Sequence, residues 1–106
     1  MPMAEYKIEI AARAKRDMRE VYEYISGNLK EPNAADRLLD KIETKIISLK
    51  SMPLRHAIER DEQLKLRNLR KLIVGNYLVF YTVNEKAETV FIVRVLYARR
   101  DWMNLL

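Results

Sequence analysis

Two strand-like runs joined by a glycine-containing turn constrain the fold of this chain more than any other feature. The pair Gly75-Asn76 separates an apolar run at residues 69–74 from another at 77–83. Glycine accepts a positive φ at little cost, so a two-residue turn of this kind predicts a β-hairpin. A polar stretch at 84–88 and a third β-branched run at 89–96 follow. We therefore expect three antiparallel strands in this part of the chain.

The N-terminal half carries one strand pattern followed by two helix patterns. Residues 6, 8 and 10 are apolar and alternate with charged residues, as in a strand with one buried face. From Arg13 the apolar residues change to helical spacing, and residues 26–28 with Pro32 interrupt this helix. Asn33, with Asp36 three residues later, is expected to cap a second helix that ends at 51–53. The apolar residues of the two helices are Met18, Val21, Tyr22, Ile25 and Leu29, then Ala35, Leu38, Leu39, Ile42, Ile46 and Leu49.

The order of these patterns predicts the fold class. Strands at both ends with helices between them indicate an α+β domain of order β-α-α-β-β-β, with a short helix or tail after Arg99. We expect a small antiparallel sheet packed against an N-terminal helical hairpin, and a loop at residues 54–63, where periodicity is weak. Residues 1–106 show no repeat or linker and form a single predicted domain.

Composition limits the classes of function. The chain has no cysteine, glycine only at positions 27 and 75, and a single histidine, His56, in a charged segment. Disulfides, thiolate chemistry, phosphate-binding glycine loops and paired-histidine metal sites are therefore not expected, and we predict neither a metal nor another cofactor. No apolar run is long enough to suggest a membrane span or a signal segment, so a cytoplasmic location is the simplest expectation. The net charge of +5 and the pI near 9.6 favour an anionic partner.

Cationic residues at the strand ends form the candidate site. Arginine binds phosphate oxygens through its planar fork and keeps its charge at any working pH. If the second and last strands are neighbours, their cations could converge into a site for RNA or for an acidic peptide; the alternative is a solvated sheet edge. Tyr97 lies at the last strand's end beside Arg99, where its ring could stack on a base or its hydroxyl act on a proton. The cations are Lys65, Arg67, Arg70 and Lys71, then Arg94, Arg99 and Arg100.

These segments, taken in order, resemble the RelE/ParE superfamily of toxins from bacterial type II toxin-antitoxin modules. The likeness covers nearly the whole chain. The residues that carry it are Tyr6-Lys7-Ile8-Glu9-Ile10, Ala14-Lys15-Arg16-Asp17-Met18 leading to Tyr24-Ile25, Leu49-Lys50-Ser51-Met52-Pro53, Arg70-Lys71-Leu72, Tyr77-Leu78-Val79-Phe80-Tyr81, and Arg94-Val95-Leu96-Tyr97-Ala98-Arg99-Arg100-Asp101. The resemblance implies a growth-inhibiting toxin, of a kind linked to plasmid stabilisation, that a cognate antitoxin neutralises by wrapping over it.

Within that superfamily two activities compete. RelE-like members cut mRNA on the ribosome without a metal, and the resemblance then gives catalytic roles to Arg70, Tyr97 and Arg99. Lys65, Arg67, Arg94 and Arg100 would bind the target or its phosphates. ParE-like members inhibit DNA gyrase and are not enzymes.

One strand position separates the two activities. Ribonuclease members commonly carry an arginine in the strand matched by residues 77–81, where this chain has Leu78. This departure, the well-developed helical hairpin and the ending Arg99-Arg100-Asp101 favour the ParE side. A basic interaction domain without toxicity is a further alternative.

Overall fold

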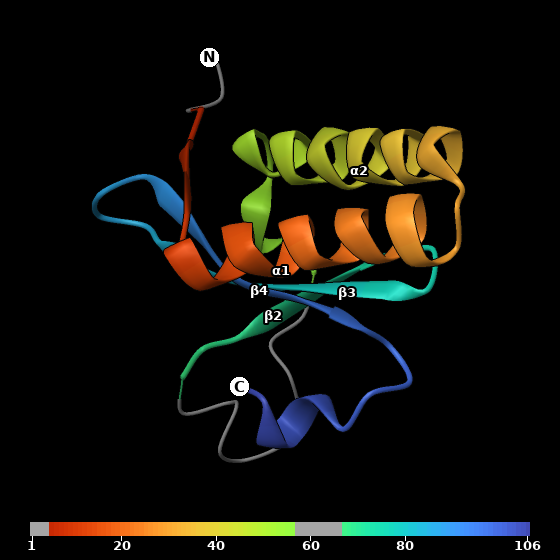
Figure 1. The fold of residues 1–106 in the computed structure, drawn as a ribbon. Helices are drawn as coiled ribbons and strands as arrows, with labels where there is room; N and C mark the ends of the chain where they lie inside the picture. Colours follow the sequence, from red (N-terminus) through yellow and green to blue (C-terminus); the bar gives the residue numbers. More distant parts are fainter. Residues whose placement is uncertain (1–4, 57–66) are drawn as a thin grey trace.

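The elements follow the chain in the predicted β-α-α-β-β-β order. The computed structural model describes residues 5–56 and 67–106. Its helices and strands are β1 (Lys7–Ile10), α1 (Ala12–Glu23), a π-helix (Tyr24–Asn28), α2 (Pro32–Ile47), 3-10 turns at Ser48–Lys50 and Pro53–Arg55, β2 (Arg70–Val74), β3 (Tyr77–Asn84), β4 (Thr89–Tyr97) and a 3-10 turn at Trp102–Asn104. In Figure 1 both helices lie on one face of the sheet, and the C-terminal turn lies below the other face. In the described residues, no helix combines the length and the apolar character needed to cross a membrane.

The sheet contains one pairing that the periodicity alone does not predict. Its strand order is β1-β4-β3-β2, so β3 separates β2 from β4. The three C-terminal strands pair antiparallel, as expected, whereas β1 pairs parallel with β4. A parallel pair needs a crossover connection, and the helical hairpin provides it. The sheet is therefore mixed rather than wholly antiparallel.

The β2–β3 hairpin forms at the predicted turn. Gly75 has a φ of +58°, and Val74 pairs with Tyr77 on either side of the two turn residues. The positive φ at the first turn position is the conformation for which glycine was expected here. Farther along, Phe80 pairs with Arg94 and Tyr81 with Ile92, so β4 carries one extra residue at Val93. Arg94, the residue after this bulge, contacts Asp17 of α1, and the bulge changes the direction of β4 locally.

The helical hairpin turns later than the sequence pattern suggests. Residues 24–28 continue α1 as a π-helix, and the chain reverses at Lys30, whose φ is +55°. The predicted cap at Asn33 is wrong, because α2 already begins at Pro32 with Glu31 at the N-cap and no capping side chain. Proline suits the first helical position, because a backbone N–H at that position would have no hydrogen-bond partner within the helix and its absence costs nothing. At the same junction, a hydrogen bond to Asp36 and the negative charge of Asp36 raise the pKa of the Tyr22 phenol.

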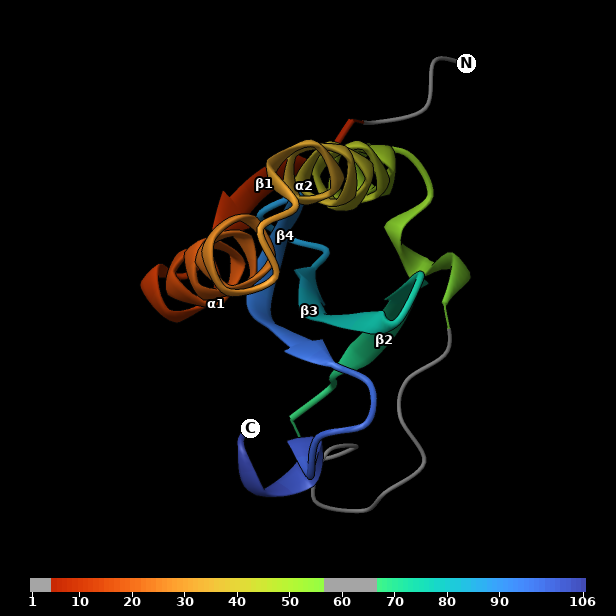
Figure 2. The same cartoon turned by 45° about the vertical axis from the view of Figure 1, so that its right-hand side comes forward.

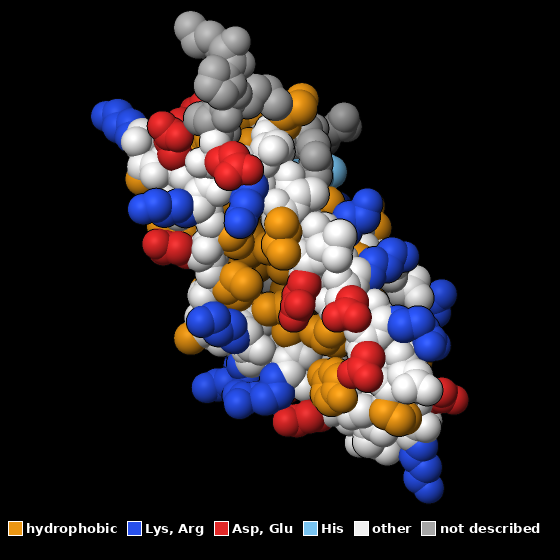
Figure 3. Space-filling view, turned by 90° about the horizontal axis from the view of Figure 1, so that it is seen from above, with side chains coloured by type: hydrophobic (Ala, Val, Ile, Leu, Met, Phe, Trp, Pro, Cys, Tyr) orange, Lys and Arg blue, Asp and Glu red, His pale blue; other side chains and the backbone are white. Residues whose placement is uncertain are grey.

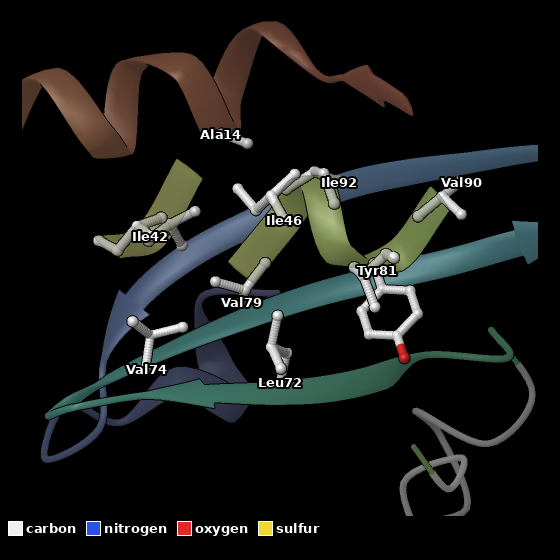
Figure 4. Packing of buried hydrophobic residues seen from close by; sticks show 11 residues of the cluster. Ala14, Ile42, Ile46, Leu72, Val74, Val79, Tyr81, Val90 and Ile92 are labelled. Carbon is white, nitrogen blue, oxygen red and sulfur yellow. The ribbon is translucent and has the colours of Figure 1, made fainter. Parts of the chain in front are cut away.

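The main core lies between the helical hairpin and the sheet. Side chains of α1, α2 and the following turn project onto the inner face of all four strands (Figure 4). Tyr81 is fully buried among them, and its hydroxyl donates to the carbonyl of Pro53 at 3.0 Å. The cluster comprises Ala14, Ile42, Ile46, Leu49, Leu72, Val74, Val79, Tyr81, Val90, Ile92 and Val95.

A second, smaller core covers the opposite face of the sheet. Leu69, Leu78, Phe80 and Leu96 are buried there beneath the C-terminal turn. The rings of Phe80 and Trp102 lie 5.1 Å apart, and Leu105 and Leu106 pack against the same cluster. Figure 2 shows the C-terminal turn on the side of the sheet away from both helices. The short segment expected after Arg99 is thus a packed part of the fold.

Candidate functional site

An apolar groove opens between the helical hairpin and one end of the sheet. Its volume is about 730 Å³. The C-terminal half of α1, the π-helix and the start of α2 form one side, and the β2–β3 turn with the ends of β3 and β4 forms the other. Among the described residues, the charged ones that line it are Asp17, Glu20 and Arg100. The other lining residues are Val21, Tyr24, Ile25, Leu29, Ala34, Leu38, Gly75, Asn76, Tyr77, Val95 and Tyr97.

Two tyrosines on neighbouring strands form the sheet side of this groove. Tyr77 pairs with Tyr97 across β3 and β4, and their ring centroids are 5.5 Å apart. Burial raises the pKa of the Tyr77 phenol above the ordinary value of 10.0, and the phenols of Tyr97 and Tyr24 add to the shift. Tyr77 therefore stays neutral at physiological pH, where it can donate a hydrogen bond but cannot serve as a base.

The turn after β4 brings Arg100 to the groove. The Arg100 N–H donates to the carbonyl of Tyr97 at 3.0 Å, and this turn places the Arg100 side chain among the lining residues. Arg99, the adjacent residue, is exposed. The structure therefore brings Tyr97 and Arg100 together and leaves Arg99 accessible in the same turn.

Arg70 does not join this group. It pairs with Tyr81, which pairs with Ile92, whereas Tyr97 is in register with Tyr77 and Val74. Val74 lies four positions after Arg70 along β2, or about 13 Å at the rise of a strand. The Arg70 guanidinium instead donates to the carbonyls of Leu54, at 3.4 Å, and of His56. Arg70 therefore does not converge with Tyr97, Arg99 and Arg100 at the end of the last strand.

Arg94 is buried in an ion pair rather than presented to a ligand. Its Nε and Nη2 donate to the Asp17 carboxylate at 2.7 and 3.0 Å, and Nη1 donates to the carbonyl of Leu105. Only 8% of Arg94 and 4% of Asp17 is exposed. Asp17 also accepts from the Val95 N–H at 3.0 Å. These contacts involve all three guanidinium nitrogens, so the phosphate-binding role expected of Arg94 does not fit its position.

The remaining predicted cations lie near the second core or outside the described residues. Arg67 donates from Nη1 to the carbonyl of Leu106 at 3.0 Å, and the Lys71 ammonium lies 5.4 Å from the Trp102 ring centroid. Lys65 lies outside the described residues. Leu78 is 6% exposed and belongs to the second core. The residues expected to act together are thus divided between the two faces and the two ends of the sheet. No group of residues suited to hold a metal ion is found in the parts of the chain that the structure describes.

A family model provides the assignment that the fold alone does not. The model described as the ParE toxin of the type II toxin-antitoxin system parDE matches residues 8–102. The chain belongs to the ParE toxin family. The match includes every helix and strand from α1 to β4, so it covers both the groove and the buried ion pair of this ParE family chain. No curated protein sequence matches the chain at a significant level.

Solved structures show that the ParE family chain shares its fold with both kinds of toxin. A chain of the chromosomal ParDE system of P. aeruginosa aligns with a TM-score of 0.74 at 15% identity, over 91% of this chain and 99% of that one. A double mutant of the E. coli toxin RelE in the free state aligns with a TM-score of 0.67 at 14% sequence identity, over 95% of this chain and 92% of that one. A chain of the M. tuberculosis toxin-antitoxin complex RelBE2 aligns with a TM-score of 0.63 at 22% sequence identity, over 91% of this chain and 94% of that one. These identities support a common fold.

Proposed function

We propose that this chain is the toxin of a type II toxin-antitoxin pair and that it inhibits growth by binding DNA gyrase, in the ParE manner, rather than by cutting RNA. The positions of Arg70 and Arg94 carry the proposal, because neither can reach the phosphate that Tyr97, Arg99 and Arg100 could share. Metal-independent RNA cleavage needs a proton carrier and several cations around one phosphate. Here Arg70 is about 13 Å along the sheet from the Tyr97 end, Arg94 is paired with Asp17, and Leu78 is buried. The match to the ParE family model supports the same choice.

The Tyr97→Phe variant separates the two mechanisms. This change removes only the hydroxyl and keeps the ring packed on Tyr77. Binding of gyrase through the ring predicts growth inhibition within about twofold of the unmodified chain, whereas loss of a general acid or base costs about 10²- to 10⁴-fold. Growth after induction measures this effect, and a supercoiling assay with purified gyrase measures target inhibition directly. A hundredfold loss of toxicity together with loss of transcript cleavage would establish the ribonuclease mechanism instead.

The antitoxin is proposed to occupy the groove between the helical hairpin and the sheet. An amphipathic helix binds such a groove through apolar residues on one face. Tyr24 and Leu29 are about half exposed at its mouth, so apolar surface is available for a partner. Viewed from above, hydrophobic side chains form a band along the helical layer with charged side chains on both sides (Figure 3). Two of the solved structures with this fold are complexes of a RelE-type chain with its RelB-type partner.

A charge placed at the groove mouth tests this interface. We expect Leu29→Glu to abolish growth rescue by the co-expressed antitoxin and to weaken the complex at least tenfold, because it puts a carboxylate against the apolar face of the partner. Leu54→Glu is the matched control, since Leu54 is 42% exposed, compared with 51% for Leu29, and does not line the groove. Equal rescue of both variants in a co-purification and growth assay would exclude the groove as the antitoxin site.

A further inference from the structure

The outer face of α1 carries an unbalanced set of cations. Arg13, Lys15, Arg16 and Arg19 are all exposed within the first two turns. The one acidic residue in this stretch, Asp17, is buried and forms an ion pair with Arg94. Every exposed ionisable side chain between residues 12 and 19 is therefore positive. We call these four residues the α1 cationic face.

The placement of these charges opposes the helix dipole. Cations are favourable near a helix C-terminus and anions near its N-terminus. In α1 the first turn contains no acidic residue and the last turn contains no basic one. Glu20 and Glu23 instead follow the cations toward the C-terminal end. The helix dipole therefore does not account for this order of charges.

The side chains of these cations have few partners among the described residues. There, no ion pair or hydrogen bond involves the side chains of Lys15, Arg16 and Arg19, and the single ion pair of Arg13, with Asp17, is long at 3.7 Å. The exposed cations of α2 differ, because acidic residues alternate with them along that helix. The α2 residues concerned are Asp36, Arg37, Asp40, Lys41, Glu43 and Lys45. The α1 cationic face is thus a local excess of positive charge that the exposed surface of α2 does not share.

We propose that the α1 cationic face binds the phosphate backbone of duplex DNA without reading its sequence. Residues 13 to 19 span about 9 Å along the helix axis, a length over which a duplex presents several phosphates. Three of the four residues are arginines, which grip phosphate oxygens through two N–H groups. The face also has no exposed large hydrophobic residue, the kind that a protein interface places at its centre. This inference does not depend on gyrase being the toxin target.

Matched triple variants of the full chain test the proposal. Lys15→Gln with Arg16→Gln and Arg19→Gln removes three positive charges from α1, and Arg37→Gln with Lys41→Gln and Lys45→Gln removes three from α2. Fluorescence anisotropy with a labelled duplex of arbitrary sequence, between 50 and 200 mM salt, measures affinity and its salt slope. We expect the α1 variant to bind the duplex at least about tenfold more weakly. The slope of log K against log salt concentration should become less steep by about 2.7, or 0.9 for each lost phosphate contact. The α2 variant should stay within about threefold of the unmodified chain.

Three results would overturn the proposal. The first is equal weakening of both variants, which would mean that only net charge matters. The second is no binding of the duplex by the unmodified chain at 50 mM salt. The third is stronger binding of a poly-glutamate peptide than of the duplex, with loss of that binding in the α1 variant, which would identify an acidic protein as the partner. Circular dichroism of both variants establishes that the helices remain folded.

Discussion

Replacing Arg94 with methionine is expected to lower the free energy of unfolding by about 3–5 kcal/mol, the usual cost of breaking a buried ion pair from one side. The Asp17 carboxylate would remain buried and would keep only the Val95 N–H among its strong donors. The C-terminal segment would also lose the hydrogen bond from Arg94 to Leu105. Urea denaturation followed by circular dichroism measures the change. A domain of this size has a free energy of unfolding of about 5–15 kcal/mol in total, so the variant is expected to lose a large share of its stability.

Two further variants isolate the cause of this loss. Arg13→Met removes the other arginine near Asp17, but that side chain is about half exposed and 3.7 Å away, so we expect a loss below about 1 kcal/mol. Pairing Asp17→Leu with Arg94→Met removes both charges, and apolar replacement of a whole buried pair is often neutral. The double variant should therefore recover much of the stability that the single Arg94 variant loses. A loss below 1 kcal/mol for Arg94→Met itself would contradict the account.

Local patterns in the sequence predict most of the elements but not how they meet. The Gly75-Asn76 turn, the alternation in β1 and the helical spacing in α1 and α2 are each set by neighbouring residues, and the structure confirms them. The parallel pairing of β1 with β4 depends on residues about 80 positions apart, such as Ile8 and Val90. Periodicity along the chain carries no information about that partner.

The candidate site was harder to predict for the same reason. Arg70 begins β2 and Tyr97 ends β4, and the register of the strands places these two residues at opposite ends of the sheet. Arg94 looks like another exposed strand-end cation until Asp17 is placed against it. One sequence signal for that pair exists: Asp17 is the single acid in a basic stretch, and it lies on the helix side that also carries Ala14 and Val21. A lone acid on the apolar side of a helix predicts a buried cationic partner.

The second core is the part of the fold that the sequence pattern least suggests. Alternation in β3 is weak, because Leu78, Val79, Phe80 and Tyr81 are all apolar and all buried. Such a run is typical of a strand covered on both faces. The helices cover one face, and the C-terminal turn covers the other with Trp102. A continuous apolar run was therefore available as a signal for this second layer.

Replacing Phe80 with alanine is expected to lower the free energy of unfolding by about 3–5 kcal/mol, the usual cost of truncating a buried aromatic side chain. Phe80 is fully buried and contacts the Trp102 ring, so its loss leaves a cavity beneath the C-terminal turn. Phe91→Ala is the matched control in the same sheet, because Phe91 is 37% exposed and lies outside both cores. For that variant we expect a loss below about 1.5 kcal/mol. Urea denaturation of both variants gives the comparison.

Coupling between Phe80 and Trp102 decides whether the C-terminal turn belongs to the folded unit. If the turn packs on the sheet as one layer, each single alanine variant removes the same contact between the Phe80 and Trp102 rings. The free energy of unfolding of the double variant should then fall by about 0.5–1.5 kcal/mol less than the sum of the two single losses. Strict additivity would mean that the turn contributes nothing through Phe80. In that case the second core would owe its stability to contacts within the sheet and with Leu105 and Leu106, rather than to the Trp102 ring.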